Sequence, residues 1–464
     1  HSPFRAWWPL RMGSRLAAVS CMLVGFGVKG DPVRALPRTA DWLNRELPPR
    51  DRAQRLIQQM TAEERLVLLQ GAGGAGIGNT APIPRLHIPA FRLEDGPSGV
   101  ADWQTNVTNW PSTLTMAATW DAALMHEYGR ALGQEQRGKG MQVMLGPGVN
   151  LARVPVGGRN FEYLGEDPAL ASALAAAEVT GIQSEGVVAC VKHWADNNQE
   201  GPGHNGRLFT SSVVSDRTNF ELYFQPFEAA ALAGAGSVMC SYNLINGTYS
   251  CQNERYLTTH LKGHLGFDGW VVSDWGADHN SIASLNAGMD QTMPGDLSGN
   301  STANATAAAI LAGAVPRSRI EDALTRILTP LIAVGAVDRT DYGNSSSDVR
   351  TYAHSELNIQ FAQSSTTVLI NDGVLPLSPT ASYRLGVVGD ATNVKGGGSG
   401  SVWSTHIVSP AEGICSRLAA GEPHPAIARL ATAVPAGERS GWTPPRRNVT
   451  TGGEGVASPP CRPV

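Results

Sequence analysis

The sequence has few cysteines, almost balanced charge and no apolar stretch that spans a bilayer comfortably. Its 6 cysteines include no C-x-x-C pair, so their spacing gives no metal signature. Its 40 acidic residues nearly balance 36 lysines and arginines, which leaves a net charge of −4. Charge therefore gives no argument for nucleic-acid binding. The apolar stretch of residues 16–28 is too short for a transmembrane helix, and we expect no stable membrane association.

That apolar stretch has the surroundings of a secretory signal peptide. Three arginines precede it and residues 29–31 (Lys-Gly-Asp) follow it, an order typical of such peptides. Met12 is a sensible start, so we predict that residues 1–30 are upstream sequence and signal peptide, and that the protein is secreted. A short internal apolar helix is the alternative. Glycosylation sequons favour secretion; they lie at Asn106, Asn246, Asn300, Asn304, Asn344 and Asn448.

From about residue 88 the pattern alternates between short apolar runs and amphipathic helical segments. This alternation favours parallel strands joined by helical crossovers, and a (β/α)8 TIM-like barrel of about 250 residues fits within the 464-residue chain. Strands are expected at residues 89–93, 143–145, 187–191, 237–240, 269–273 and 288–290. Helices are expected at residues 122–133, 169–184, 220–233 and 319–335.

Polar side chains follow several of these expected strands. The apolar run before Asp274 places a carboxylate at a strand end, and strand ends form the catalytic face of such a barrel. A Ser-Asp pair after a strand is also a common helix N-cap, so this signal needs support from other segments. The other polar groups expected at the same face are Asp95, Arg159, Lys192, His193 and Tyr242.

A second unit begins near residue 355. A helix is expected to about residue 365, followed by strands at residues 366–370 and 385–389. After residue 414 the hydrophobic periodicity fades and prolines and arginines dominate, so residues 415–464 are predicted to be irregular or disordered. Cys240 and Cys251 either form a disulfide across a short loop or remain as two buried thiols.

Seven motifs follow one another along the chain, at residues 93–97, 158–162, 164–168, 192–194, 198–200, 239–243 and 273–276. In sequence and in order they resemble glycoside hydrolase family 3, and within it the secreted β-glucosidases. The resemblance covers roughly residues 61–414. It implies a TIM-like barrel at residues 31–340, followed by an incomplete α/β sandwich domain at residues 355–414, with the match to the family ending shortly after that domain begins.

The resemblance implies a retaining, exo-acting β-glucosidase that removes terminal glucose from a β-glucoside or cello-oligosaccharide. Asp274 would be the nucleophile that forms a covalent glycosyl-enzyme, with a second carboxyl group about 5–5.5 Å away. In the family that acid/base is a Glu on the second domain. Its only counterpart here is Glu454, which residues 444–447 (Pro-Pro-Arg-Arg) precede in place of a strand; the alternative is a solvated tail residue.

The resemblance also carries over a set of sugar contacts. Each has a structural alternative: Arg159 could form an ion pair with Glu162, and Tyr242 and His193 could be core residues. Ala101 stands where the family commonly has Arg, and residues 201–207 are atypical. The implied contacts are Asp95, Arg159, Lys192, His193, Met239, Tyr242, Trp275 and Ser399.

Four other functions compete with this one. A nucleotide-binding oxidoreductase is suggested by G-x-G-x-x-G at residues 71–76, but a capped helix precedes that motif and residues 79–82 (Asn-Thr-Ala-Pro) break a helix after it. An inactive sugar-binding fragment, a β-xylosidase and an N-acetylglucosaminidase, which Gly203-His204 resembles loosely, remain open. No metal or organic cofactor is implied, and the oligomeric state is left open.

Overall fold

The computed structural model describes residues 40–72, 76–201, 206–295, 307–377, 397–403 and 408–420. Its main feature is a curled, mixed sheet with the strand order β1-β2-β3-β4-β6-β9. Neighbouring strands from β2 to β9 are parallel, whereas β1 is antiparallel to β2. The strands are β1 (Gly78–Asn79), β2 (Arg92–Asp95), β3 (Val143–Leu145), β4 (Val188–Trp194), β6 (Ser237–Cys240) and β9 (Trp270–Ser273).

The register of the parallel strands brings their C-terminal ends to one edge. Met239 lies between Lys192 of β4 and Val272 of β9, and Cys240 pairs with Ser273. Because parallel strands all run the same way, the residues that follow β4, β6 and β9 emerge together. The α/β class and the shared strand edge expected from the sequence are therefore present.

Isolated bridges continue the pairing beyond β9. Val272 pairs with Gln291, Thr292 pairs with Gln70, and Ala72 pairs with Asn79 of β1, so the sheet curls back toward its first strand. The strand expected at residues 288–290 is not formed. Instead, the Asp290 carboxylate accepts hydrogen bonds from the backbone N–H of Val271 and from Lys262, and these side-chain contacts could not be read from an apolar run.

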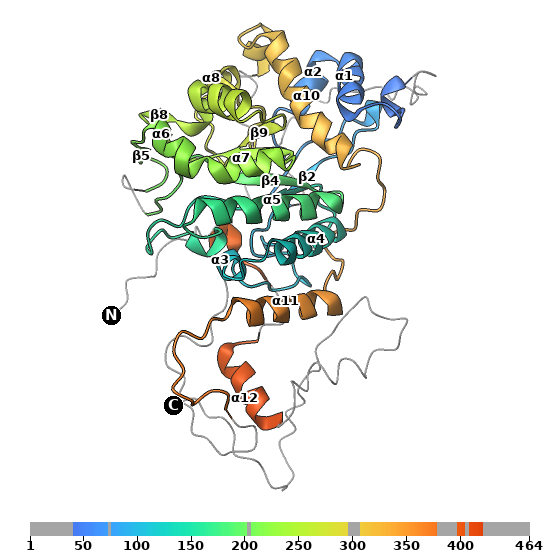
Figure 1. The fold of residues 1–464 in the computed structure, drawn as a ribbon. Coiled ribbons are helices and arrows are strands. Elements are labelled where there is room, and N and C mark those ends of the chain that lie inside the picture. The colour runs from blue at the N-terminus through green and yellow to red at the C-terminus, as the bar shows by residue number, and fades with distance from the viewer. Residues whose placement is uncertain are drawn as a thin grey trace, which may run out of the picture. The chain divides into compact units, whose positions relative to one another are not determined.

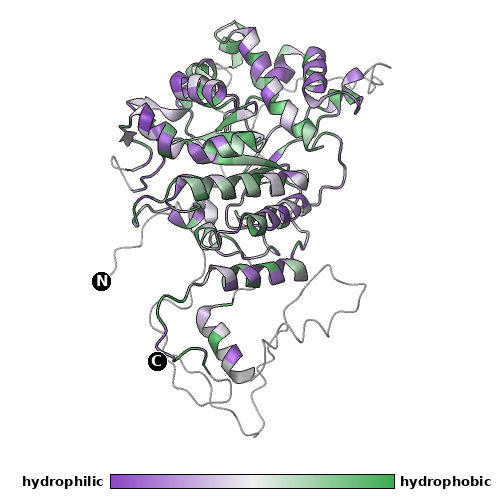
Figure 2. Cartoon of the chain, in the orientation of Figure 1, coloured by the Kyte–Doolittle hydropathy of each residue, from purple (hydrophilic) through white to green (hydrophobic). Residues whose placement is uncertain are grey.

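Helices cover the sheet, as Figure 1 shows. Helices α4, α5 and α7 pack against one another in sequence order, and α1 packs against α10. The strands are mostly hydrophobic and the helices carry both hydrophobic and hydrophilic residues (Figure 2), as expected for helices with one face toward a core. The principal helices of this part are α1 (Pro49–Gln59), α2 (Ala62–Val67), α3 (Thr113–Ala117), α4 (Ala122–Gly138), α5 (Pro168–Ser184), α7 (Gln225–Leu232), α8 (Ser281–Ala287) and α10 (Arg317–Ala333).

The segment expected as one helix at residues 220–233 is interrupted. A short α-helical turn, α6 (Asp216–Thr218), leads into a π-helical turn, η5 (Asn219–Tyr223), which precedes α7. Pro226 near the start of α7 has no backbone N–H to donate to the preceding turn, which explains the change of helix type at this point. A second, smaller sheet has no strand pairing with the main sheet among the described residues. It consists of β5 (Ser211–Ser212), β7 (Leu244–Ile245) and β8 (Thr248–Tyr249).

Gly71, the first residue of the glycine-rich segment after α2, packs closely against the backbone of a distant part of the chain. Thr61 and Glu64 form the expected capping box at the start of α2, and the two-residue strand β1, rather than a helix, follows the glycines. A Cβ atom on Gly71 would lie 2.2 Å from the Pro294 carbonyl oxygen. This glycine therefore serves close packing, and the strand-then-helix context that a dinucleotide fingerprint requires is absent from the described residues.

The C-terminal part differs from its predicted secondary structure. Helix α11 (Tyr352–Ser365) packs against α3, but residues 366–370 form no strand, and Leu369 and Ile370 are exposed. The second expected strand, at residues 385–389, lies outside the described residues. Helix α12 (Pro410–Ala420) crosses position 414, where the irregular tail was expected to begin.

The predicted domain boundaries at residues 31–340 and 355–414 remain predictions, as does the sandwich architecture of the second unit. Residues 1–30, expected to hold the signal peptide, lie outside the described residues. Within the part of the chain that the structure describes, no helix combines the length and apolar character needed to cross a membrane.

Candidate active site

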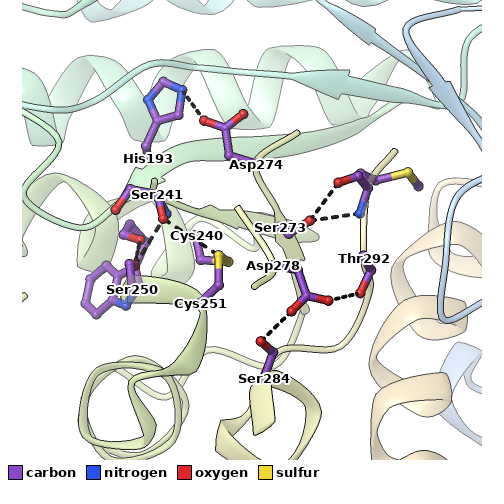
Figure 3. Close-up of a disulfide and its surroundings, with 12 residues drawn as sticks. His193, Cys240, Ser241, Ser250, Cys251, Ser273, Asp274, Asp278, Ser284 and Thr292 are labelled. Carbon is purple, nitrogen blue, oxygen red and sulfur yellow. Dashed lines mark hydrogen bonds and ion pairs between the residues drawn. A yellow bond between two sulfur atoms is a disulfide. The ribbon is translucent and has the colours of Figure 1, made fainter. Parts of the chain in front are cut away.

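Asp274 lies immediately after β9, with its backbone paired to β6. Its N–H donates to the Cys240 carbonyl at 3.1 Å, and its Oδ1 accepts from the Trp275 N–H at 2.7 Å. Oδ2 has no hydrogen-bond partner and lies 3.6 Å from His193 Nε2; Figure 3 shows the two side chains facing each other. One oxygen of this carboxylate is thus held by a backbone hydrogen bond, and the other has no hydrogen-bond partner.

Burial and nearby cations act in opposite directions on this pair. Burial raises the pKa of Asp274, while Arg159, Arg207 and Lys192, together with the Trp275 N–H, oppose the rise. Burial, and then the same three cations, hold the pKa of His193 well below its usual range. The imidazole is therefore neutral, and it can donate or accept a hydrogen bond without adding charge beside Asp274.

A buried ion pair connects β4 with β2. Lys192 Nζ donates to Asp95 Oδ1 at 2.6 Å, and the lysine side chain is almost completely buried. Burial alone would lower the pKa of Lys192, but the carboxylates of Asp95 and Glu162 outweigh it and raise the pKa. This lysine is therefore charged and held in one position at the shared strand edge.

Two further carboxyl groups adjoin Asp95. Glu94 is fully buried and accepts from Gln104 Nε2 at 2.9 Å. Burial, together with like-charge repulsion among Glu94, Asp95 and Asp102, raises the pKa of both Glu94 and Asp102. These two carboxyl groups therefore bind protons more readily than free carboxyl groups do, which reduces the repulsion around Asp95.

Arg159 joins the strand ends to residues 397–403. Its guanidinium forms an ion pair with Glu162, which is the structural alternative that the sequence left open for Arg159. Arg159 Nη2 also donates to Ser399 Oγ at 3.2 Å. The neighbouring Gly400 approaches Phe161 so closely that a Cβ atom would lie 2.5 Å from the ring. Ser399 is therefore held against the strand ends, although it lies 240 residues from Arg159 in the chain.

Tyr242, Trp275 and Met239 supply aromatic and apolar surface. The Tyr242 hydroxyl donates to the Trp275 carbonyl at 2.8 Å, and Trp275 Nε1 donates to the Ile77 carbonyl at 3.1 Å. Met239 is almost fully buried in a core cluster that Trp275 packs against. Met239 therefore supports the site from within the core, whereas Tyr242 and Trp275 are only partly buried.

A disulfide joins Cys240 and Cys251, which confirms one of the two alternatives left open by their spacing. Cys240 is the last residue of β6 and its carbonyl accepts from Asp274; Figure 3 shows the disulfide near these strand ends. The bridge therefore closes the loop that carries Tyr242 at the point where β6 meets the nucleophile candidate.

The structure brings nine of the ten predicted site residues into these linked contacts, with Met239 in the layer beneath. Glu454 lies outside the described residues. Sequence reasoning assigned no role to Asp102, Glu200 and Arg207. Their only signals were the atypical segment at residues 201–207, the motif at residues 198–200 and the Ala101 substitution. Among the described residues, no group of His, Cys, Asp or Glu side chains is arranged to hold a metal ion.

Comparison with known protein families identifies the family of this chain. The model of the glycosyl hydrolase family 3 N-terminal domain matches residues 78–330, which is more than half of the chain. The chain belongs to glycosyl hydrolase family 3.

Members of glycosyl hydrolase family 3 that resemble the chain include fungal β-glucosidases. The chain is 38% identical over 402 residues to probable β-glucosidase L of Emericella nidulans, with 78% of this chain and 53% of that protein covered. It is 39% identical over 370 residues to β-glucosidase 1 of Aspergillus aculeatus, with 70% and 43% covered. The chain spans about half the length of the curated relatives it matches.

Solved structures of the same family share the fold. A β-glucosidase from Chaetomella raphigera superposes with a TM-score of 0.73 at 34% identity, with 80% of this chain and 56% of that chain covered. β-Glucosidase 3B from Thermotoga neapolitana, in complex with α-D-glucose, gives a TM-score of 0.70 at 32% identity, with 78% and 53% covered. The family and its α/β fold are therefore established for this chain.

Proposed function

We propose that the chain carries the active centre of a retaining, exo-acting β-glucosidase that removes terminal β-D-glucosyl residues from β-glucosides such as cello-oligosaccharides. The observation that carries the proposal is Asp274, which has one anchored oxygen, one unpartnered oxygen and nearby cations. The relatives of this chain that are named as β-glucosidases support a β-glucoside as the substrate. A TIM-like barrel followed by an α/β sandwich domain is the architecture we propose for this function.

In the first chemical step, Asp274 Oδ2 attacks the anomeric carbon and the bond from that carbon to the leaving oxygen breaks. The leaving oxygen takes a proton from a carboxylic acid, for which we propose Glu454. In the second step, the resulting carboxylate takes a proton from water while the water oxygen displaces Asp274. Two inversions leave the β configuration in the product.

The remaining site residues would bind the terminal sugar. Asp95 can accept bonds from sugar hydroxyls, whereas Lys192 and Arg159 donate charge-assisted hydrogen bonds to them. Neutral His193, Tyr242 and Ser399 would add hydrogen bonds, and Trp275, with Met239 behind it, would face the apolar side of the ring. Bonds that strengthen as the ring approaches the transition state accelerate the reaction.

Hydrolysis of p-nitrophenyl β-D-glucoside by the full chain tests the nucleophile. Asp274→Asn is expected to lower kcat by at least about 10³-fold, while Asp268→Asn, the same change at an exposed residue just before β9, leaves it unchanged. Mass spectrometry after incubation with a 2-deoxy-2-fluoroglucoside should find the label on Asp274. Labelling of Asp274 without turnover of the p-nitrophenyl glucoside would indicate a stalled enzyme, and sugar binding with neither labelling nor turnover would leave a sugar-binding protein.

Three further measurements test the finer parts of the catalytic proposal. Proton NMR should show β-glucose as the first product, and α-glucose appearing first would contradict retention. Glu454→Gln should lower kcat by about 10²–10⁴-fold, with partial rescue by azide on an activated substrate. A higher kcat/KM for the β-xyloside than for the β-glucoside would make the enzyme a β-xylosidase.

We also propose secretion through residues 1–30, which detection of a processed N-terminus in culture medium would test.

A further inference from the structure

Arg207 lies over the aromatic ring that adjoins the nucleophile candidate. Its guanidinium carbon is 4.5 Å from the centroid of the Tyr242 ring, a distance at which a cation is attracted to an aromatic face. The Tyr242 hydroxyl is bonded to the carbonyl of Trp275, the residue directly after Asp274. Arg207 is thus two contacts away from the backbone that orients Asp274.

Glu200 anchors Arg207 and connects it with Arg159. Arg207 Nη1 donates to Glu200 Oε1 at 3.4 Å, and the same oxygen lies 4.0 Å from Arg159 Nη1. Arg159 in turn pairs with Glu162. Two carboxylates and two guanidinium groups therefore alternate along one side of the site, so each charge lies next to one of opposite sign.

The ion pair between Arg207 and Glu200 is too exposed to be explained by stability alone. The side chains of Arg207 and Glu200 are 31% and 26% exposed, and ion pairs in contact with water contribute at most about 1 kcal/mol. The electrostatic effect on the site is more direct, because Arg207 opposes the rise in the pKa of Asp274 that burial causes. It also contributes, after burial, Arg159 and Lys192, to the lowered pKa of His193.

We propose that Arg207 is a positioning residue, anchored by Glu200, that fixes the Tyr242 ring and places an additional positive charge beside Asp274. The inference rests on the proposed function of Asp274 as the nucleophile. Its two parts are separable: the charge acts on Asp274 through space, while the planar guanidinium acts on Tyr242 by stacking. A lysine at position 207 keeps the first and weakens the second.

The test compares Arg207→Met and Arg207→Lys with Arg217→Met. Arg217 is a matched control because it forms a surface ion pair with Glu221 and its side chain is 83% exposed. Removing the positive charge raises the pKa of Asp274, so the acid limb of kcat/KM should move to higher pH in Arg207→Met. It should stay in place in Arg207→Lys and Arg217→Met. Loss of the stacking should lower kcat by about tenfold in Arg207→Met, and by less in Arg207→Lys.

Binding of 1-deoxynojirimycin, measured by calorimetry between pH 4 and 8, gives a readout without turnover. The cationic iminosugar requires an ionised Asp274, so its affinity in Arg207→Met should fall at a higher pH than in the wild-type protein. The iminosugar's own titration is the same for every variant and cancels. If Arg207→Met does not fold, as judged by its thermal transition, Arg207→Gln takes its place.

The outcomes separate the two proposals. Suppose the wild-type enzyme is active, and Arg207→Met has the same acid limb, kcat and iminosugar profile. That result overturns the role of Arg207 and leaves that of Asp274 intact. Equal shifts in Arg207→Met and Arg217→Met also overturn it, because the effect would then be one of net charge. A wild-type protein that neither hydrolyses the glucoside nor binds the iminosugar overturns both proposals.

Discussion

At the scale of single residues, the candidate site is built from charges that are buried in pairs. Lys192 lies within β4 and Asp95 is the last residue of β2, and their side chains meet at 2.6 Å. A charge removed from water is tolerated only when a partner of opposite sign compensates it. The pair that we expect to bind the sugar is therefore also a pair on which the fold depends.

Replacing Lys192 with Met should destabilise the protein strongly. It leaves Asp95 buried without its cation, and breaking such a pair costs about 3–5 kcal/mol of unfolding free energy. Chemical denaturation measures this cost. Arg317→Met is the control, because the Arg317 side chain is 76% exposed in its pair with Glu321 and its loss should cost at most about 1 kcal/mol. Equal costs for the two variants would contradict a buried, charge-dependent pair.

Glu178 on α5 is a buried carboxyl group outside the site. Neither of its side-chain oxygens has a hydrogen-bond partner, and burial raises its pKa from 4.5 to about 8. The folded state therefore keeps the proton over a pH range in which the unfolded state releases it. By linkage, the contribution of this group is fully present below pH 4.5 and is lost as the pH rises toward about 8.

Glu178→Gln should remove this pH dependence. Glutamine has a similar shape and does not titrate, so the unfolding free energy of the variant relative to wild type should rise between about pH 4.5 and 8. Urea denaturation at several pH values measures the difference. Glu127→Gln, at an exposed glutamate on α4, should show no such trend. A difference that stays constant with pH would mean that Glu178 is ionised in the folded protein.

At the scale of elements, the loop between β6 and the π-helical segment η7 (Arg255–His264) carries both Tyr242 and the disulfide. The bridge joins residues 11 positions apart and restricts the unfolded chain as well as the folded loop. Because Cys240 also accepts the backbone bond of Asp274, the disulfide contributes both to stability and to the strand edge that presents the nucleophile candidate.

Replacing both Cys240 and Cys251 with Ala should lower the unfolding free energy by about 2–3 kcal/mol, as expected for a bridge that closes a short loop. Cys190→Ala is the control, since it removes a buried free thiol and should cost less. Dithiothreitol should lower the Tm of the wild-type protein to near that of the double variant, and should not change the Tm of the double variant. A reductant effect of equal size on both would exclude the disulfide as its cause.

At the scale of the whole molecule, the apolar segment that follows α11 is exposed in the described part of the chain. Val368, Leu369 and Ile370 are 59%, 88% and 90% exposed, and they were expected to form a strand. Contiguous exposed apolar residues with strand propensity favour association between molecules.

Leu369→Lys combined with Ile370→Lys should therefore reduce self-association, which light scattering at increasing protein concentration measures. Val213→Lys is the control, because Val213 is 88% exposed but lies elsewhere in the chain. The Tm should change little, since the replaced side chains pack against almost nothing. If Val213→Lys reduced scattering equally, added charge rather than the apolar segment would explain the effect.

The local sequence by itself determined the elements whose signals are contained within a few residues. The strand Val143–Leu145, the capping box at Thr61 and the position of Asp274 directly after β9 follow the sequence predictions. Apolar runs and caps act on their own backbone, so these features do not depend on distant residues.

Tertiary structure decided everything that depends on partners far apart in the chain. The strand expected at residues 288–290 is replaced by bridges at Gln291 and Thr292, and the Asp290 carboxylate forms ion pairs with Lys262 and Arg319. Ser399 meets Arg159, and Arg207 acquires a role only because the fold places it over Tyr242. Strand pairing, burial and charge contacts have energies that depend on which groups meet in space, and a one-dimensional pattern does not contain that information.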